Sequence, residues 1–135
     1  MVAVADTNVA VYFLLGTPGF AEEAEAFWVA VKHAHAPSHW EAECANVIWL
    51  SCRQRTLDPD RAIEKLVLAQ RLPIRRCPIR TLWRGAVERS LATGVAVYDT
   101  LFVELAAQRG CPLATFDQQV LHAFPALACR PRDLV

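Results

Sequence analysis

Four acidic residues, widely separated in the chain, lie where apolar segments end or turn. Asp6 and Asp117 each follow a short apolar run, and Asp99 follows residues 95–97. Glu43 lies within an otherwise apolar helical segment. Carboxylates without a His or Cys ligand pattern suit Mg²⁺ or Mn²⁺ rather than zinc. A cation bound by such a cluster can activate water for attack on a phosphodiester. We therefore predict that these four acids form one catalytic, metal-binding site.

Three of these acids also have a purely structural interpretation. Asp6, Asp99 and Asp117 each stand at the start of a predicted helix, where a carboxylate can cap free N–H groups or favour the helix dipole. For Asp99 and Asp117 this interpretation stays open. Asp6 favours a functional site, because an acid that closes a buried strand is costly without a partner.

Glu43 is distinguished from its neighbour Glu41 by the start of its helix. Ser38 and Glu41 have the spacing of a capping box, in which the Ser side chain accepts the backbone N–H of Glu41 and the Glu side chain accepts the backbone N–H of Ser38. Glu43 has no such role, and residues two apart face different sides of a helix. We therefore assign Glu43 to the site, with Asn46, one turn later, as a supporting residue.

Hydrophobic periodicity and turn residues predict short strands that alternate with helices. The predicted strands are residues 2–5, 35–37, 72–78, 112–115 and 126–130, and the predicted helices end near residues 15, 33, 53, 71, 93, 109 and 124. Pro59 predicts a helix start after Asp58, and Gly94 and Gly110 predict helix ends. The alternation predicts a single α/β domain over residues 1–135, with a central parallel sheet covered on both faces. Ligands of such sheets lie at the carboxyl ends of the strands, where the acids are expected.

Four segments in this order resemble the acidic motifs of PIN domains, most closely those of VapC toxins of bacterial type II toxin–antitoxin systems. They are Asp6-Thr7-Asn8, residues 43–48 (ECANVI), residues 98–106 (YDTLFVELA) and residues 113–117 (LATFD). The resemblance extends from Val2 to about Leu121. It implies an α/β/α sandwich, a homodimer and a cognate antitoxin whose tail covers the active-site groove.

The same resemblance implies cleavage of RNA that depends on Mg²⁺ or Mn²⁺. The metal-binding acids by position are Asp6, Glu43, Asp99 and Asp117, and the supporting polar residues are Thr7, Asn8 and Thr115. Cys44 and the adjacent His39-Trp40 depart from the aliphatic or small residues that the family tends to carry there, which affects the expected packing around Glu43.

The bulk composition limits the remaining possibilities. Fourteen basic residues balance fourteen acidic ones, so net charge argues neither for nor against nucleic acid. Arginines at 53–55 and 71–84 suit either phosphate binding or a solvated helical face. The five cysteines show no zinc or disulfide pattern, and no apolar stretch approaches the length of a membrane span. A cytoplasmic protein without membrane contact is the expectation.

Other functional classes lack their motifs. An aspartyl-nucleophile phosphate hydrolase would need a second acid at position 8, which is Asn8. A dinucleotide-binding GxGxxG and a hydrolase GxSxG are both absent. The alternative that stays open is a catalytically silent PIN domain that binds RNA or protein.

Overall fold

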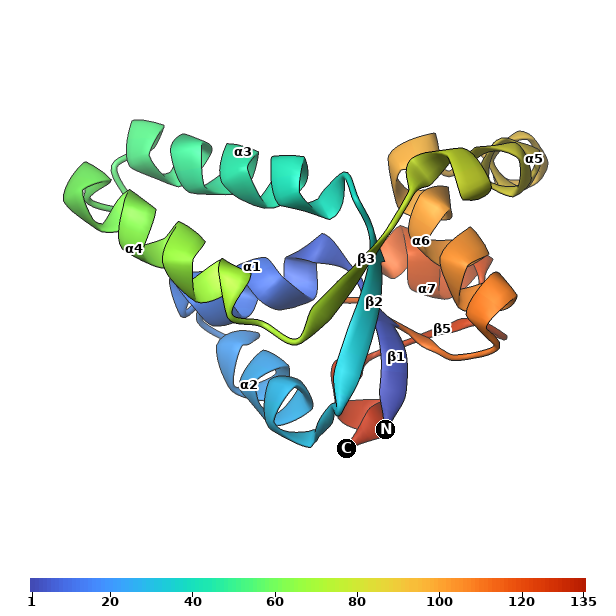
Figure 1. The fold of residues 1–135 in the computed structure, drawn as a ribbon, viewed down its shortest axis with the longest axis horizontal. Coiled ribbons are helices and arrows are strands. Elements are labelled where there is room, and N and C mark those ends of the chain that lie inside the picture. The colour runs from blue at the N-terminus through green and yellow to red at the C-terminus, as the bar shows by residue number, and fades with distance from the viewer.

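The computed structural model describes all residues, 1–135, as a five-stranded parallel sheet between two layers of helices (Figure 1). The strands follow the order β3-β2-β1-β4-β5 across the sheet. Their bounds are β1 Val2–Ala5, β2 His33–Pro37, β3 Ile74–Cys77, β4 Leu113–Ala114 and β5 Ala128–Cys129. This arrangement confirms the predicted α/β fold with a central parallel sheet.

Seven helices connect and cover these strands. They are α1 Thr7–Leu15, α2 Ala21–Ala30, α3 Trp40–Arg53, α4 Pro59–Gln70, α5 Trp83–Thr93, α6 Val97–Arg109 and α7 Gln118–Ala123, with 3₁₀ turns at Ile79–Thr81 and Pro131–Leu134. Figure 1 shows α1 to α4 on one side of the sheet and α5 and α6 on the other, with α3 and α4 extending outward as a pair. The acids on α3 and α6 therefore come from opposite layers.

The register of the sheet brings distant strand ends together. Ala5 pairs with Ala114, so the last residue of β1 lies beside the last residue of β4. Both strands are almost wholly buried, as is Phe102 of α6, which belongs to the same apolar core. Because both strands run in the same direction, the residues that follow them emerge at one edge of the sheet.

Most predicted helix boundaries agree with the structure. The Asp58 side chain accepts the Asp60 backbone N–H at 3.0 Å, with Pro59 as the first helical residue. Gly94 and Gly110 end α5 and α6 in the left-handed conformation, at φ of 77° and 62°. That conformation suits glycine because it has no Cβ.

The predicted capping box at the start of α3 is wrong. The N-cap position is His39, and no side chain caps this helix end. The Ser38 backbone N–H donates to Cys77 O at 2.9 Å, which holds Ser38 in the turn after β2. Glu41 instead forms an ion pair with Arg76 of β3 at 3.1 Å, a contact between segments far apart in sequence.

No single helix is long and apolar enough to cross a membrane; only α5 and α6 taken together, across a 116° bend, have the required length and composition.

Candidate active site

Asp6 occupies the carboxyl end of β1 and is held by the end of β4. The residue is only 7% exposed, and although it stands at the N-cap of α1, it makes no side-chain capping bond. Instead Oδ2 accepts the Thr115 hydroxyl at 2.6 Å and the Asn8 amide at 3.3 Å. Asn8 in turn accepts the backbone N–H of Phe116 at 3.2 Å. Thr115 and Asn8, both predicted as supporting residues, therefore orient Asp6.

The electrostatics of Asp6 connect it with the other three acids. Burial is the main reason that its pKa rises from 3.8 to about 7, and the hydrogen bond from Thr115 opposes this rise. The negative charges of Asp99, Glu43 and Asp117 raise the pKa further. The charges of three acids thus act on the fourth, although the four residues come from separate segments of the chain.

Glu43 reaches the site from the first turn of α3. Its Oε1 accepts the hydroxyl of Thr7 at 2.7 Å, which links α3 to the first residue of α1. The same oxygen lies 3.4 Å from Nε2 of His39, the N-cap residue of α3. The side chain of Glu43 is 33% accessible, so it is more exposed than the buried Asp6.

Asp99 enters from the opposite layer, in the first turn of α6. Burial is the largest cause of its raised pKa. The negative charges of Asp117 and Glu43 raise the pKa further, whereas His39 lowers it. A half-buried carboxylate beside two others favours either a proton or a cation.

Asp117 combines the two interpretations that the sequence left open. Its Oδ1 accepts the backbone N–H groups of Gln119 and Val120 at 2.8 and 3.1 Å, so it does cap α7. Both capping bonds use a single oxygen. Its charge also raises the pKa of Asp6 and Asp99, so capping α7 and contributing to the acidic site are compatible.

Two residues depart from the sequence prediction. Asn46, proposed as a supporting residue, is exposed and joins none of the hydrogen bonds around the acids. His39 was not predicted, yet it contacts Glu43 and the start of α6. The available signal was the four-residue spacing between His39 and Glu43, which places two side chains on one helix face.

The chemistry of the donors suits a hard divalent cation, whereas their present arrangement is not a closed cage. All four groups offer carboxylate oxygen, and burial together with the neighbouring charges destabilises the charged forms of Asp6 and Asp99. No set of three or more His, Cys, Asp or Glu side chains has the mutual placement of a metal-ligand cluster. Mg²⁺ commonly binds through one or two carboxylates and keeps several waters, so a closed protein cage is not required.

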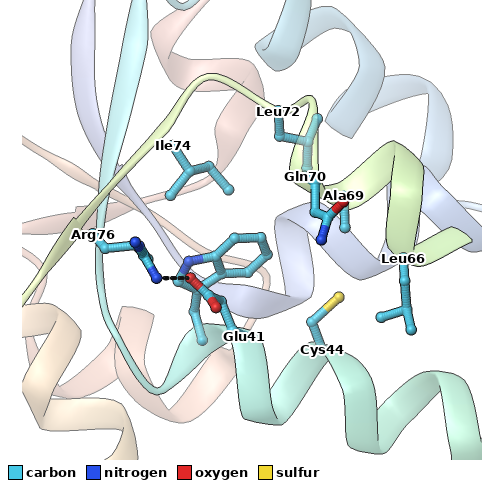
Figure 2. A pocket seen from close by; sticks show the side chains of 9 residues that line it. Glu41, Cys44, Leu66, Ala69, Gln70, Leu72, Ile74 and Arg76 are labelled. Carbon is cyan, nitrogen blue, oxygen red and sulfur yellow. Dashed lines mark ion pairs between the residues drawn. The ribbon is translucent and has the colours of Figure 1, made fainter.

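A separate cavity of about 490 Å³ lies between α3, α4 and β3. Figure 2 shows Cys44, Leu66 and Ile74 around it, with the ion pair of Glu41 and Arg76 at one side. None of the four acids lines this cavity. All five cysteines, Cys44 among them, are free thiols, as the sequence predicted.

Comparison with known proteins identifies the family. The family model described as PIN domain matches residues 3–125. The chain is 29% identical over 114 residues to a protein named Ribonuclease VapC12 from Mycobacterium tuberculosis, which covers 84% of this chain and 85% of that protein. It is also 32% identical over 95 residues to Ribonuclease VapC3 from the same organism, covering 68% and 66% of the two chains.

Two solved structures share the fold. VapBC2 from Rickettsia felis, solved bound to a DNA fragment from its promoter, aligns with a TM-score of 0.66 at 13% identity, covering 96% of this chain and 98% of that one. FitAcB from Neisseria gonorrhoeae aligns with a TM-score of 0.62 at 20% identity, covering 97% and 98%. With the family match over residues 3–125, these findings show that the chain belongs to the PIN-domain family.

Proposed function

We propose that the protein is a metal-dependent endoribonuclease and the toxin of a type II toxin–antitoxin system. The observation that carries this proposal is the gathering of four carboxylates at one edge of the sheet, where Asp6 has a pKa of about 7. A fold places so many mutually repelling acids together at a cost in stability, so a positively charged ligand is the expected compensation. The relatives named Ribonuclease VapC support RNA as the substrate.

The cation is Mg²⁺ or Mn²⁺ in this proposal, and its protein ligands are drawn from Asp6, Glu43, Asp99 and Asp117. When bound, such an ion lowers the pKa of a water molecule and stabilises negative charge on a phosphodiester. The reaction is hydrolysis, with in-line attack of water on phosphorus and departure of the sugar oxygen.

The chain itself contributes orientation and electrostatics. Thr115 and Asn8 hold one oxygen of Asp6, and Thr7 holds one oxygen of Glu43, so each carboxylate keeps a defined direction. The backbone N–H groups of α7 do the same for Asp117. Fixed directions matter because catalysis depends on groups that are already in place when charge develops.

Exposed apolar side chains support the proposed protein partners, a cognate antitoxin and a second copy of this chain. One group lies on α3 and α4 and another on α5 and α6; the exposed residues are Trp49, Ile63, Val67 and Leu68 in the first and Trp83, Val87, Leu91, Val97 and Tyr98 in the second. Large exposed apolar groups of this kind mark interaction surfaces. Tyr98 lines a groove of about 850 Å³, and His39, which lies next to the acids, lines the same groove. A toxin of this type acts in the cytoplasm, where its RNA and antitoxin are found.

Cleavage of RNA by the purified protein tests the proposal. Wild type is incubated with a mixed RNA pool in Mg²⁺, Mn²⁺ or EDTA, beside Asp6→Asn, Asp99→Asn and the control Asp60→Asn. Asp60 is an exposed acid on α4, apart from the site. We expect metal-dependent cleavage by wild type and the control, with a loss of at least about a hundredfold in both site variants, comparable to the loss of a preorganised electrostatic group.

The alternative of a silent PIN domain has a different outcome. RNA that is bound but uncut in every metal would support a binding module and contradict the nuclease proposal. Full activity of Asp6→Asn or Asp99→Asn would contradict the assignment of that residue.

A further inference from the structure

His39 lies between the two helical layers that supply the acids. Its side chain is only 9% exposed, and its Nε2 lies 2.9 Å from the backbone oxygen of Tyr98 and 3.4 Å from Oε1 of Glu43. A carbonyl oxygen can only accept a hydrogen bond, so Nε2 carries a proton and donates. That N–H donates to Tyr98 O, and the same nitrogen lies within ion-pair distance of Oε1 of Glu43. Residue 98 directly precedes Asp99, so His39 connects the helix of one acid to the helix of the other.

The packing of the imidazole keeps it in this orientation. The ring centroid lies 5.0 Å from that of Phe102, a core residue that is 1% exposed, and 6.0 Å from that of Tyr98. The second ring nitrogen, Nδ1, is buried and has no hydrogen-bond partner. Turning the ring over would remove Nε2 from Tyr98 O, so the observed orientation is the one that satisfies a donor.

The contacts of Glu43 show what this orientation achieves. The hydroxyl of Thr7 donates to Oε1 at 2.7 Å, and His39 approaches the same atom. Thr7 belongs to α1, and His39, at the N-cap of α3, is held against α6 by its bond to Tyr98 O, so two side chains contact the same oxygen. The other oxygen, Oε2, has no hydrogen-bond or ion-pair partner in the protein.

We infer that His39 is a positioning residue, which holds the carboxylate of Glu43 in place for cation binding through the contact of its Nε2 with Oε1. The inference rests on the proposed function, because it assumes that the acids bind a divalent ion. Residues that orient a metal ligand from outside the ligand shell typically change metal affinity by about 10–100-fold when they are replaced.

Mn²⁺ binding to the full-length protein provides the test, followed by electron paramagnetic resonance of the free ion and by calorimetry. His39→Gln places an amide N–H three bonds from Cβ, where Nε2 of the ring stands, whereas the amide of His39→Asn stands only two bonds away, at the position of Nδ1. The two variants are both polar and differ by one methylene. His39→Leu retains apolar packing against Phe102 and removes the donor. His33→Leu is the control, because His33 pairs with Val2 at the opposite end of the strands.

We expect Mn²⁺ affinity to fall about tenfold or more in His39→Leu and His39→Asn, and to remain within about threefold of wild type in His39→Gln and in the control. Rescue by glutamine but not asparagine indicates that an N–H at the position of Nε2 is required, because both replacements are polar amides and only glutamine places its N–H there. Thermal unfolding in EDTA identifies any variant that does not fold, and the comparison of Gln with Asn then decides alone.

Unchanged Mn²⁺ affinity in His39→Leu or His39→Asn would overturn the role of His39 while leaving the proposed function intact. Equal losses in Gln and Asn would overturn it as well. No Mn²⁺ binding by wild type would contradict the proposed cation site itself, and the role of His39 with it.

Discussion

The high pKa of Asp6 makes the stability of the cation-free protein depend on pH in a defined direction. The unfolded chain releases the Asp6 proton near 3.8, and the folded protein releases it near 7. Between these values the folded state retains a proton that the unfolded state lacks, so the free energy of unfolding falls as pH rises. The rise in pKa corresponds to about 4 kcal/mol, fully lost above the folded pKa.

Asp6→Asn should remove this loss. Asparagine has the same shape, and its Oδ1 can still accept the Thr115 hydroxyl and the Asn8 amide, but it carries no charge at any pH. In EDTA, the variant and wild type should have similar stability near pH 4. At pH 8 the variant should be more stable by up to about 4 kcal/mol, since the repulsion from Asp99 and Glu43 is also removed.

Urea unfolding in EDTA at pH 4, 6 and 8 measures the effect, with Asp60→Asn as the control. The difference between wild type and Asp6→Asn isolates residue 6, because the other titrating groups are common to both proteins. A difference that stays constant from pH 4 to pH 8 would show that Asp6 ionises normally, and would refute the argument that burial and the neighbouring acids destabilise its charge.

Two further predictions concern packing and charge away from the site. Gly85→Ala should lower the free energy of unfolding by about 1 kcal/mol although alanine favours helices, because a Cβ at Gly85 meets the carboxyl group of Glu104, which pairs with Arg89 at 2.8 Å. In a Glu104→Ala background the same change should instead raise the free energy of unfolding by about 1 kcal/mol. Urea unfolding measures both effects, and the same sign in the two backgrounds would contradict this reasoning. Glu23→Gln should lower the free energy of unfolding by about 1.5–3 kcal/mol at pH 7. Burial raises the pKa of Glu23, but hydrogen bonds from Arg130 and Arg132 outweigh it and hold the pKa below 4.5. The loss should therefore shrink as pH falls through the lowered pKa, and a loss that does not depend on pH would indicate lost packing instead.

The edge of the sheet where the acids gather was predictable from local patterns. Apolar runs at residues 2–5 and 112–115 predict buried strands, and strands separated by helices pair in parallel. Parallel strands end at the same edge, so Asp6 and Asp117 are expected to be neighbours without any knowledge of distances. The structure agrees: Ala5, directly before Asp6, pairs with Ala114, three residues before Asp117.

The side-chain partners of the acids were less predictable. The sequence favours Glu43 over Glu41 because the spacing of Glu41 from Ser38 predicts a capping box, which does not form in the structure. Glu41 lies instead beside Arg76, which depends on the placement of β3 next to β2. The order of strands is a property of the whole fold, so no local pattern contains this contact. The same applies to His39, whose main partner is a backbone oxygen 59 residues further along the chain.

The acidic site lowers the stability of the cation-free fold in order to keep its carboxylates in fixed orientations. Asp6 has a raised pKa in spite of a short hydrogen bond from Thr115 that lowers it. If that hydrogen bond served stability alone, an apolar or neutral side chain at position 6 would serve better, since it would remove the repulsion as well. Thr115 and Asn8 instead keep a costly carboxylate in one orientation, and Thr7 and His39 do the same for Glu43. A carboxylate that binds a cation must keep a fixed orientation even when its negative charge is not neutralised, because the cation neutralises that charge only when it is bound.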